Sequence, residues 1–277
     1  MPKRLLADVF RRGGVRMARL FSMVEPVSLE ERPACGRLCH NHALEARLIQ
    51  FSLLPTQGLR HACVEIEFRF VPFSDVGGDF ADFFQLADGL IHVYLGDVVG
   101  KGLPAAMYSA LAMGTLRGIH KTGTDTAKFL TLLNQRLAQR PIPGRFCSTL
   151  YAVFNPASRE LTFSNAGIPL PLLVSGGTCR QLGEGGFPSG MFPDAAYEQH
   201  VVQLDPGDCV LFASDGLHEL RNPEEVEFGS AHLSEAWSQC HQKSALDSVD
   251  FIFERQRAFS NGNAPHDDIA AVVLKVL

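Results

Sequence analysis

Long hydrophobic runs are missing from this sequence of 277 residues. No stretch reaches the roughly 18 consecutive apolar residues that a membrane-spanning helix needs. Residues 1–20 are basic and only partly apolar, and they lack the continuous apolar centre of a secretory signal peptide. We therefore expect no transmembrane helix and a cytoplasmic location. Contact between the basic N-terminus and a membrane surface is the less favoured alternative.

Cysteine is scarce, and positive charge is not in excess. The seven cysteines are odd in number and scattered, which favours reduced thiols over a disulfide framework. The formal net charge of −5 and the pI of about 6.1 argue against a general nucleic-acid binder. With 46% hydrophobic residues, the chain can form one sizeable domain with its own core.

Two common kinds of catalytic motif are also absent. The sequence has no Gly-x-Ser-x-Gly nucleophile elbow and no cysteine in a phosphate-binding loop. The Gly-Lys-Gly of residues 100–102 lacks the Gly-x4-Gly-Lys-[Ser/Thr] spacing of a nucleotide-binding loop. Chemistry through a serine or cysteine nucleophile is therefore not what this sequence predicts.

The hydrophobic pattern predicts strands and helices in separate blocks. Alternation of apolar and charged residues in 61–73 is typical of a half-buried antiparallel strand. Further strands are predicted over residues 83–86, 91–95, 149–154, 160–164, 170–174, 179–182, 201–204, 209–212 and 269–276. Helices are predicted over residues 42–54, 105–120, 126–139, 232–240 and 245–259. Because strict strand–helix alternation is absent, we expect an α+β fold with antiparallel sheets covered by helices.

Aspartates recur at the ends of these predicted strands. Asp79, Asp97, Asp215 and the pair Asp267-Asp268 each lie next to glycine or at a turn. For Asp79 and Asp97 taken alone, ordinary turn chemistry is an equal alternative. If the strand ends converge, the carboxylates would repel one another unless cations lie between them, and such oxygen ligands suit magnesium, manganese or calcium. Two ions about 3.5–4 Å apart can ionise a bridging water for attack on phosphorus.

Several ordered motifs resemble the SpoIIE/RsbU branch of the PPM metal-dependent serine/threonine phosphatases. The similarity covers residues 43–277, and residues 45–50 with 53–55 resemble the linker helix that precedes the domain in that family. Its motifs are Val76–Phe80, Gly96–Ala105, Asn165–Gly167, Ser214–Glu219, Phe228–Gly229 and Asp267–Ile269. One departure is Ile168, where the family often has histidine after Asn-Ala-Gly.

The resemblance implies an αββα sandwich of two antiparallel sheets flanked by helices, with two manganese or magnesium ions at one end. It implies that Asp97 bridges both ions, helped by the backbone carbonyl of Val98. Asp79 would complete one metal site, and Asp215 with Asp267 would complete the other. Gly78 and Asp268 would contact these ligands and hold them in place without binding an ion themselves. The implied organisation is an N-terminal arm over residues 1–42, a linker helix over 43–55 and a phosphatase domain over 56–277.

The implied activity is hydrolysis of phosphoserine or phosphothreonine on a regulatory protein, by a water activated between two metal ions. In that family the substrate is often an anti-anti-sigma-factor-like protein of a partner-switching system. A regulatory binding module of the same fold with little turnover is the alternative, and a phosphatase acting on small molecules is a third possibility. The apolar stripe within residues 42–54 raises the possibility of a homodimer.

Overall fold

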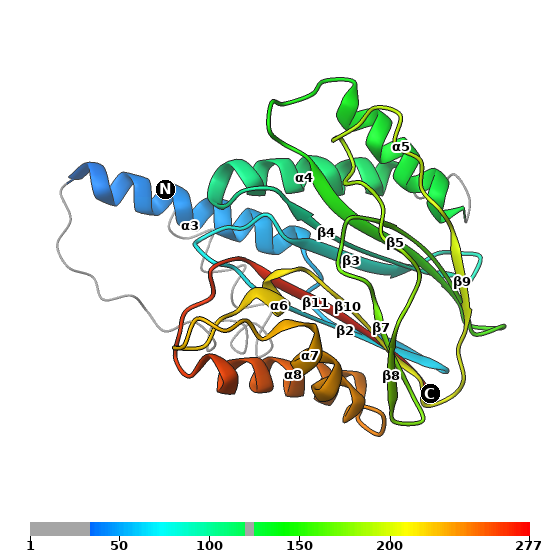
Figure 1. The fold of residues 1–277 in the computed structure, drawn as a ribbon. Coiled ribbons are helices and arrows are strands. Elements are labelled where there is room, and N and C mark those ends of the chain that lie inside the picture. The colour runs from blue at the N-terminus through cyan, green and yellow to red at the C-terminus, as the bar shows by residue number, and fades with distance from the viewer. Residues whose placement is uncertain (1–33, 120–124) are drawn as a thin grey trace, which may run out of the picture. The chain divides into compact units, whose positions relative to one another are not determined.

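A computed structural model describes residues 34–119 and 125–277, with side chains from His42 onward (Figure 1). The chain divides into two compact units, residues 1–42 and residues 43–277. Of the first unit, only the beginning of helix α3 (Ala34–Leu53) is described. The rest of the predicted N-terminal arm, residues 1–33, lies outside the described residues. No helix among the described residues is both long enough and apolar enough to span a bilayer.

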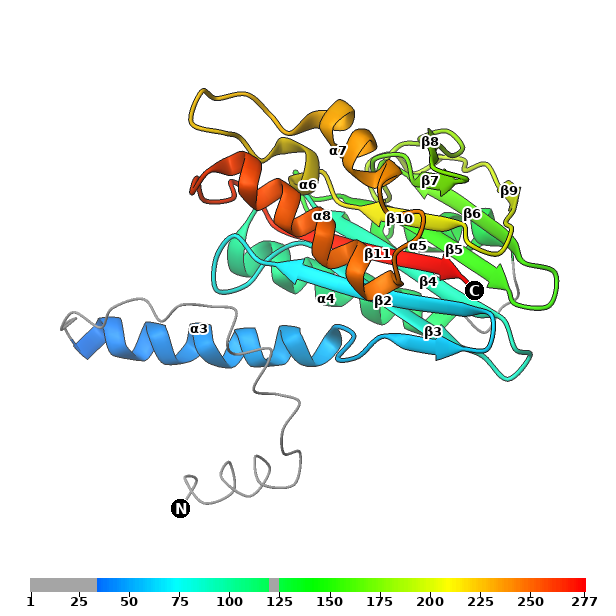
Figure 2. The same cartoon turned by 90° about the horizontal axis from the view of Figure 1, so that it is seen from below.

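The second unit contains two antiparallel sheets that pack face to face (Figures 1 and 2). The first has the order β1-β2-β11-β10-β7-β8, and the second has the order β3-β4-β5-β6-β9. The strands of the first are β1 (Leu59–His61), β2 (Val64–Val71), β11 (Ile269–Val276), β10 (Cys209–Ala213), β7 (Leu172–Ser175) and β8 (Thr178–Gln181). Those of the second are β3 (Phe80–Gln85), β4 (Ile91–Val98), β5 (Cys147–Asn155), β6 (Glu160–Ala166) and β9 (His200–Gln203).

Helices cover the outer faces of both sheets, as the α+β sandwich predicts. Helices α4 (Gly102–Ile119) and α5 (Thr126–Ala138) lie on the second sheet, and α6 (Gly216–Glu219), α7 (Gly229–Ser238) and α8 (Ala245–Ser260) lie on the first (Figure 2). The N-terminus of α5 is capped by Asp125, which accepts the Lys128 N–H. The predicted fold class is confirmed.

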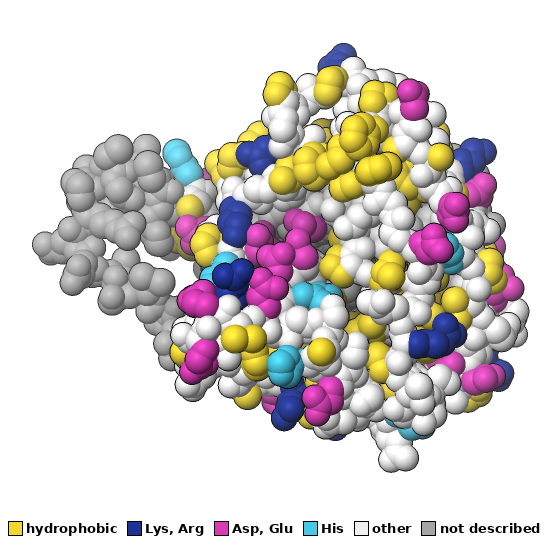
Figure 3. All heavy atoms as spheres, viewed as in Figure 1, with side chains coloured by type: hydrophobic (Ala, Val, Ile, Leu, Met, Phe, Trp, Pro, Cys, Tyr) yellow, Lys and Arg dark blue, Asp and Glu magenta, His cyan; other side chains and the backbone are white. Residues whose placement is uncertain are grey.

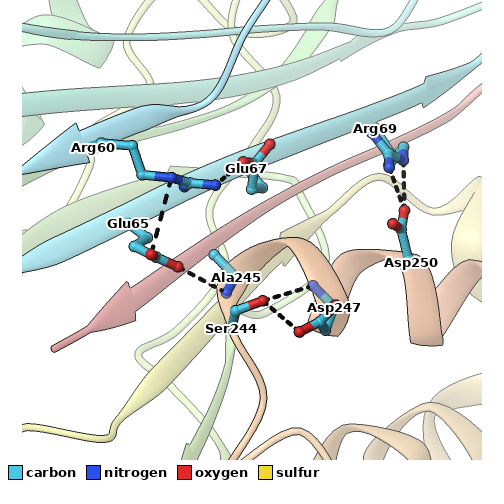
Figure 4. A network of polar contacts seen from close by, with 8 residues as sticks. All are labelled: Arg60, Glu65, Glu67, Arg69, Ser244, Ala245, Asp247 and Asp250. Carbon is cyan, nitrogen blue, oxygen red and sulfur yellow. Dashed lines mark hydrogen bonds and ion pairs between the residues drawn. The ribbon is translucent and has the colours of Figure 1, made fainter. Parts of the chain in front are cut away.

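Helix α8 is tied to strand β2 by polar contacts as well as by packing (Figure 4). Its first residue, Ala245, donates its N–H to Glu65, and Arg69 forms an ion pair with Asp250 one turn further along. Ser244 caps the same helix end by accepting the Asp247 N–H at 3.0 Å. These contacts fix α8 across the outer face of the first sheet.

The core has three layers that follow from the alternation of side chains along each strand. Ile91, Val93 and Leu95 of β4 face the space between the sheets, whereas Tyr94 and Val98 face α4 and α5. Every residue of β11 is buried, because this strand is paired on both sides and covered on both faces. A third cluster, centred on the fully buried Trp237, joins α7 and α8 to the first sheet.

The structure differs from the predicted elements mainly at their boundaries. Helix α3 begins at Ala34, eight residues before the predicted start. Strand β4 continues to Val98, because its main chain stays paired with Ser148 and Cys147, so Asp97 lies within the strand and not after it. The predicted strands 201–204 and 209–212 flank a turn, but they enter different sheets: β9 pairs with β6, and β10 pairs with β7 and β11.

Candidate metal centre

The predicted aspartates come from both sheets and meet at one end of the sandwich. Asp79 precedes β3 and Asp97 is the second-last residue of β4 in one sheet, whereas Asp215 follows β10 and Asp267 precedes β11 in the other. The charges of Asp97, Asp215, Asp267 and Asp268 raise the pKa of Asp79, of Asp97 or of Asp215, so these five groups lie close together. We call these five residues the acid cluster. Acidic side chains gather at this place on the surface, with Lys or Arg beside them (Figure 3).

Asp79 is the most buried member of the acid cluster, with 1% of its surface exposed. Burial, followed by the charge of Asp97, raises its pKa well above the ordinary value, although a hydrogen bond with Ser214 acts in the opposite direction. Its Oδ2 has no hydrogen-bond partner among the described residues. A buried carboxylate oxygen without a donor is costly unless a proton or a cation occupies it.

Asp97 lies between the two halves of the cluster. Burial raises its pKa to about 7, with further contributions from Asp215 and Asp267, and hydrogen bonding with Asp79 offsets part of the rise. The next residue, Val98, is fully buried, and its carbonyl oxygen faces Gly78: a Cβ on Gly78 would lie 2.7 Å from that oxygen. The absence of a side chain at Gly78 therefore lets the loop before β3 approach the end of β4.

Asp215 and Asp267 form the other half of the acid cluster. Burial raises the pKa of Asp215, and the charges of Glu219 and Asp267 raise it further. Asp215 occupies the position before α6 and makes no side-chain capping bond there, although a hydrogen bond with the Gly216 main chain lowers its pKa. Asp267 Oδ2 lies 3.0 Å from Lys101 Nζ, and the same ammonium group donates to the carbonyl of His266.

Asp268 is engaged by main-chain donors on both of its oxygens. Its Oδ1 accepts the Phe73 N–H at 2.7 Å, and its Oδ2 accepts the Gly78 N–H at 2.6 Å. A side chain on Gly77 would collide with the Asp268 carboxylate. Burial raises the pKa of Asp268 and these hydrogen bonds lower it. Asp268 therefore holds the loop that carries Asp79, and neither of its oxygens is left without a donor.

The donor set fits divalent cations in its chemistry. It offers carboxylate and carbonyl oxygens, an orphaned oxygen on Asp79, and mutual repulsion that a cation would relieve. Within residues 34–119 and 125–277, however, no three His, Cys, Asp or Glu side chains are grouped so that they could hold an ion as they stand. Binding would therefore require these side chains to draw together.

Asp215 also lines a groove of about 400 Å³. His218 lines it, and burial lowers the pKa of this histidine. The other lining residues are Pro169, Leu170, Gln181, Glu219, Glu227, Gly229 and Ser230.

Two sequence features lie apart from the cluster. Asp82, which lies in β3 three residues after Asp79, does not join it: its Oδ2 accepts from Arg117 at 2.7 Å and from the Tyr94 hydroxyl at 3.2 Å. Ile168 is 3% exposed and packs into the core between the sheets, while its N–H and carbonyl bond to the Asn165 side chain. The departure from histidine at this position therefore puts an apolar side chain into the core.

Three residues that contribute to the cluster were not predicted from the sequence. Gln50 of α3 bonds to the main chain of Gly77, and Ser214 hydrogen bonds with Asp79. Arg145 donates to the carbonyl of Val99, immediately beyond the predicted ligand Val98. Ser214 could have been found from its place beside Asp215, but nothing in the sequence marks Gln50 or Arg145, because both act through main-chain groups.

The chain is similar in sequence to proteins of known family. Residues 87–277 match the family model described as Stage II sporulation protein E (SpoIIE). The chain is 26% identical over 229 residues to phosphoserine phosphatase RsbU of Bacillus subtilis, covering 82% of this chain and 68% of RsbU. It is 25% identical over 258 residues to protein IcfG of Synechocystis, covering 83% of this chain but only 40% of IcfG.

Among solved structures, the SiaA-PP2C domain of Pseudomonas aeruginosa resembles this chain with a TM-score of 0.78 and 20% sequence identity. The superposition covers 89% of this chain and 99% of that domain. Two antiparallel sheets with flanking helices are thus shared along almost the whole of that domain.

Proposed function

This chain belongs to the SpoIIE family, and we propose from that membership that it is a metal-dependent protein phosphatase acting on phosphoserine or phosphothreonine of a regulatory protein. The observation that carries the proposal is the acid cluster: carboxylates from two sheets lie together, Asp79 and Asp268 buried and the others half-buried, and one Asp79 oxygen has no donor among the described residues. A structural role alone would not favour burying so many like charges in one place.

Within this proposal, Asp79, Asp97, the Val98 carbonyl, Asp215 and Asp267 would hold the metal ions. Magnesium or manganese, when bound, would supply an activated water and neutralise charge developing at phosphorus. Asp268 and Gly78 hold the loop of Asp79 through the hydrogen bond between them. Lys101 positions the Asp267 carboxylate by its ion pair. The chain then needs no serine or cysteine nucleophile of its own.

The proposed substrate is a phosphorylated regulator of a partner-switching system, similar to an anti-anti-sigma factor. RsbU carries the name phosphoserine phosphatase, which supports a phosphoserine substrate for this chain as well. We place the protein in the cytoplasm, where the free thiols of its described cysteines would stay reduced.

We also propose that residues 43–55 are a linker helix, that residues 56–277 are the phosphatase domain, and that residues 42–54 mediate a homodimer. Leu44, Leu48 and Ile49 on this part of α3 are exposed, which supports an interface there. Light scattering of Leu48→Glu and Ile49→Glu tests the contact. A wild-type monomer, with activity unchanged in both variants, would contradict it.

The experiment that tests the activity is manganese-dependent hydrolysis of p-nitrophenyl phosphate and of a phosphoserine peptide. Wild type is compared with Asp97→Ala and Asp215→Ala, and Asp88→Ala in the exposed β3–β4 turn is the matched control. We expect metal-dependent turnover in wild type and control, and its loss in both cluster variants.

A binding module with little turnover is the second candidate, because the part of the chain that the structure describes has no group of side chains already arranged to hold an ion. Calorimetric titration with manganese separates the two. Absence of both metal binding and hydrolysis in the folded wild type would favour the module.

A further inference from the structure

An unpaired guanidinium group stands at the edge of the acid cluster. Arg145 is half-buried, and its Nη1 donates to the carbonyl of Val99. The same guanidinium packs against Gly100, where any side chain would collide with it. Among the described residues no carboxylate lies within ion-pair distance of Arg145. An arginine whose guanidinium has unused N–H donors and no carboxylate partner among the described residues is suited to bind an anionic ligand.

The strand register places Arg145 beside the proposed metal ligands. On the β4–β5 ladder Asp97 is opposite Ser148, and Val98 is opposite Cys147. The ladder then continues by one hydrogen bond, from the Val99 N–H to the Phe146 carbonyl at 3.2 Å. Arg145 is the next residue, and its side chain folds back to Val99. The guanidinium therefore lies just past the end of the strand that carries Asp97.

The other cation at this end is already engaged. Lys101 Nζ pairs with Asp267 at 3.0 Å, donates to the His266 carbonyl and lies over the Phe73 ring. The ammonium group of Lys101 is thus occupied by Asp267, by the His266 carbonyl and by the Phe73 ring. Of these two cations, Arg145 is the one without a carboxylate partner among the described residues.

Exposed apolar side chains lie on three segments that adjoin Arg145: the start of α4, the turn before Arg145 and the loop bonded to Cys147. We call Leu103, Ile142, Phe187 and Phe192 the apolar rim; they are 54%, 49%, 61% and 48% exposed. Hydrophobic side chains gather over α4 and the neighbouring loops, next to the acidic group (Figure 3). An exposed apolar surface beside a reactive site is unusual for a protein that handles only small polar substrates.

Main-chain contacts fix the rim around the guanidinium. The Arg145 N–H bonds to the Ile142 carbonyl at 3.0 Å, and Leu103 follows Gly100 by three residues. Two hydrogen bonds of 2.9 and 2.8 Å join Cys147 to Ser189, which holds the loop of Phe187 against the start of β5. Phe187 and Phe192 stack edge to face with their ring centres 5.0 Å apart.

We propose that Arg145 binds the phosphate of the protein substrate and that the apolar rim packs on apolar residues flanking the phosphoserine. This inference rests on the proposed phosphatase function and names the surface that its substrate uses. The rim is continuous with the acid cluster through residues 97–103 and 145–148, so a protein presenting its phosphate to the cluster must cover it. The substrate class is a protein whose phosphoserine lies within an apolar surface.

Binding of inorganic phosphate tests the role of Arg145 without requiring turnover. Calorimetry in magnesium compares wild type, Arg145→Gln and Arg180→Gln, the last being an exposed arginine on β8. We expect the dissociation constant for phosphate to rise roughly tenfold or more in Arg145→Gln, since a charge-assisted hydrogen bond is lost, and to stay unchanged in Arg180→Gln. Equal phosphate affinity in all three proteins would overturn the assignment.

Two phosphoserine peptides test the rim, one with leucine and valine flanks and the other with serine and glycine flanks. In Phe187→Ser we expect the ratio of kcat/KM for the apolar over the polar peptide to fall about three- to tenfold. Val201→Ser, which removes an exposed apolar side chain on β9, should leave the ratio unchanged. Arg145→Gln should raise KM for both peptides more than it lowers kcat.

The outcomes separate this inference from the proposed function. A ratio unaltered in Phe187→Ser, together with conversion of a dimer to a monomer in light scattering, would assign the rim to a second copy of the chain and overturn the proposal. Wild type without metal-dependent hydrolysis would contradict the phosphatase function, while the phosphate titration would still decide whether Arg145 is an anion site.

Discussion

Gln50 and Gly77 exchange two hydrogen bonds. The Gln50 Nε2 donates to the Gly77 carbonyl at 2.6 Å, and the Gly77 N–H donates to Gln50 Oε1 at 3.0 Å. Gln50 is 6% exposed, and the adjoining Gly78 N–H is bonded to Asp268. The last turns of helix α3 are thereby joined to the loop that carries Asp79, and the geometry of the acid cluster depends on a residue outside it.

Replacing Gln50 by alanine should therefore weaken both stability and metal binding. Two main-chain groups of Gly77 would lose their partners in a buried place, which costs about 1–3 kcal/mol of unfolding free energy. We also expect manganese to bind less tightly, because the loop of Asp79 is no longer held. Denaturant unfolding and calorimetric metal titration measure the two effects. Ser52→Ala, at an exposed position on the same helix, is the control, and equal behaviour of the two variants would refute the coupling.

The metal-free protein should lose stability as pH rises. The pKa of Asp97 is about 7 in the folded chain against an ordinary value of 3.8, so between these values the folded state holds more protons than the unfolded state. The stabilising effect of this protonation is complete below about pH 4 and is lost as pH rises through about 7. We expect a fall on the order of 2 kcal/mol, or about 4–8 °C in Tm, between pH 5 and pH 8.

Asp97→Asn and added magnesium are the controls for that pH dependence. The amide cannot ionise, so the slope of Tm against pH should flatten in the variant. Magnesium at pH 8 should restore the stability of the wild type, because a cation replaces the proton between the carboxylates. A wild-type Tm that rises between pH 5 and pH 8 without metal would show that the cluster does not control this transition.

Lys101 should compete with a cation at the acid cluster. Its ammonium group lies 3.0 Å from Asp267 Oδ2, a distance at which it neutralises this proposed ligand and repels an incoming ion. Lys101→Met should therefore bind magnesium more tightly by a few-fold at low ionic strength, with a smaller difference at high salt. Calorimetry at two salt concentrations measures this, and Lys128→Met on α5 is the control. Weaker binding in Lys101→Met would mean that orientation of Asp267 by the lysine outweighs charge repulsion.

The fold and the acid cluster were largely predictable, because both depend on local patterns. Alternation along the strands predicted β11 as residues 269–276, and its structure has these bounds. Aspartates beside strand ends predicted which carboxyls would meet, since strand ends gather at the edge of a sandwich. Pairing of β2 with β11 was not predictable, because the two strands lie about 200 residues apart and neither carries a mark of its partner.

The hydrogen bonds that Gln50 and Arg145 make to the loops beside the acid cluster could not be predicted from the sequence. Gln50 and Arg145 bond to carbonyl and N–H groups, which every residue type possesses, so no residue pattern signals them. Asp82 shows the converse: it is an acidic residue only three positions after Asp79, yet its partners are Tyr94 and Arg117. Side-chain direction along β3 separates Asp82 from Asp79, and only the structure fixes that direction.

Arg117 should contribute measurably to stability through Asp82. Its Nε and Nη2 donate to Asp82 Oδ2 at 3.0 and 2.7 Å, and Nη2 also donates to the Leu53 carbonyl at the end of α3 at 2.6 Å. The Asp82 side chain is 16% exposed and that of Arg117 is 38% exposed, so solvent screens the pair only in part. Arg117→Met should lower the unfolding free energy by about 1–3 kcal/mol, because a mostly buried carboxylate loses its charged partner.

Matched variants identify the cause of that loss. Arg69 and Asp250 form a second pair between a strand and a helix, with side chains 28% and 41% exposed. Because its carboxylate is more exposed, Arg69→Met should cost at most about 1 kcal/mol. Arg117→Lys should rescue little, since an ammonium group cannot donate in the same fork to Asp82 and Leu53. The double variant Arg117→Met with Asp82→Asn should be more stable than the sum of the single losses predicts, because no unpaired carboxylate remains. Strict additivity in urea unfolding would show that Arg117 acts by packing and not through Asp82.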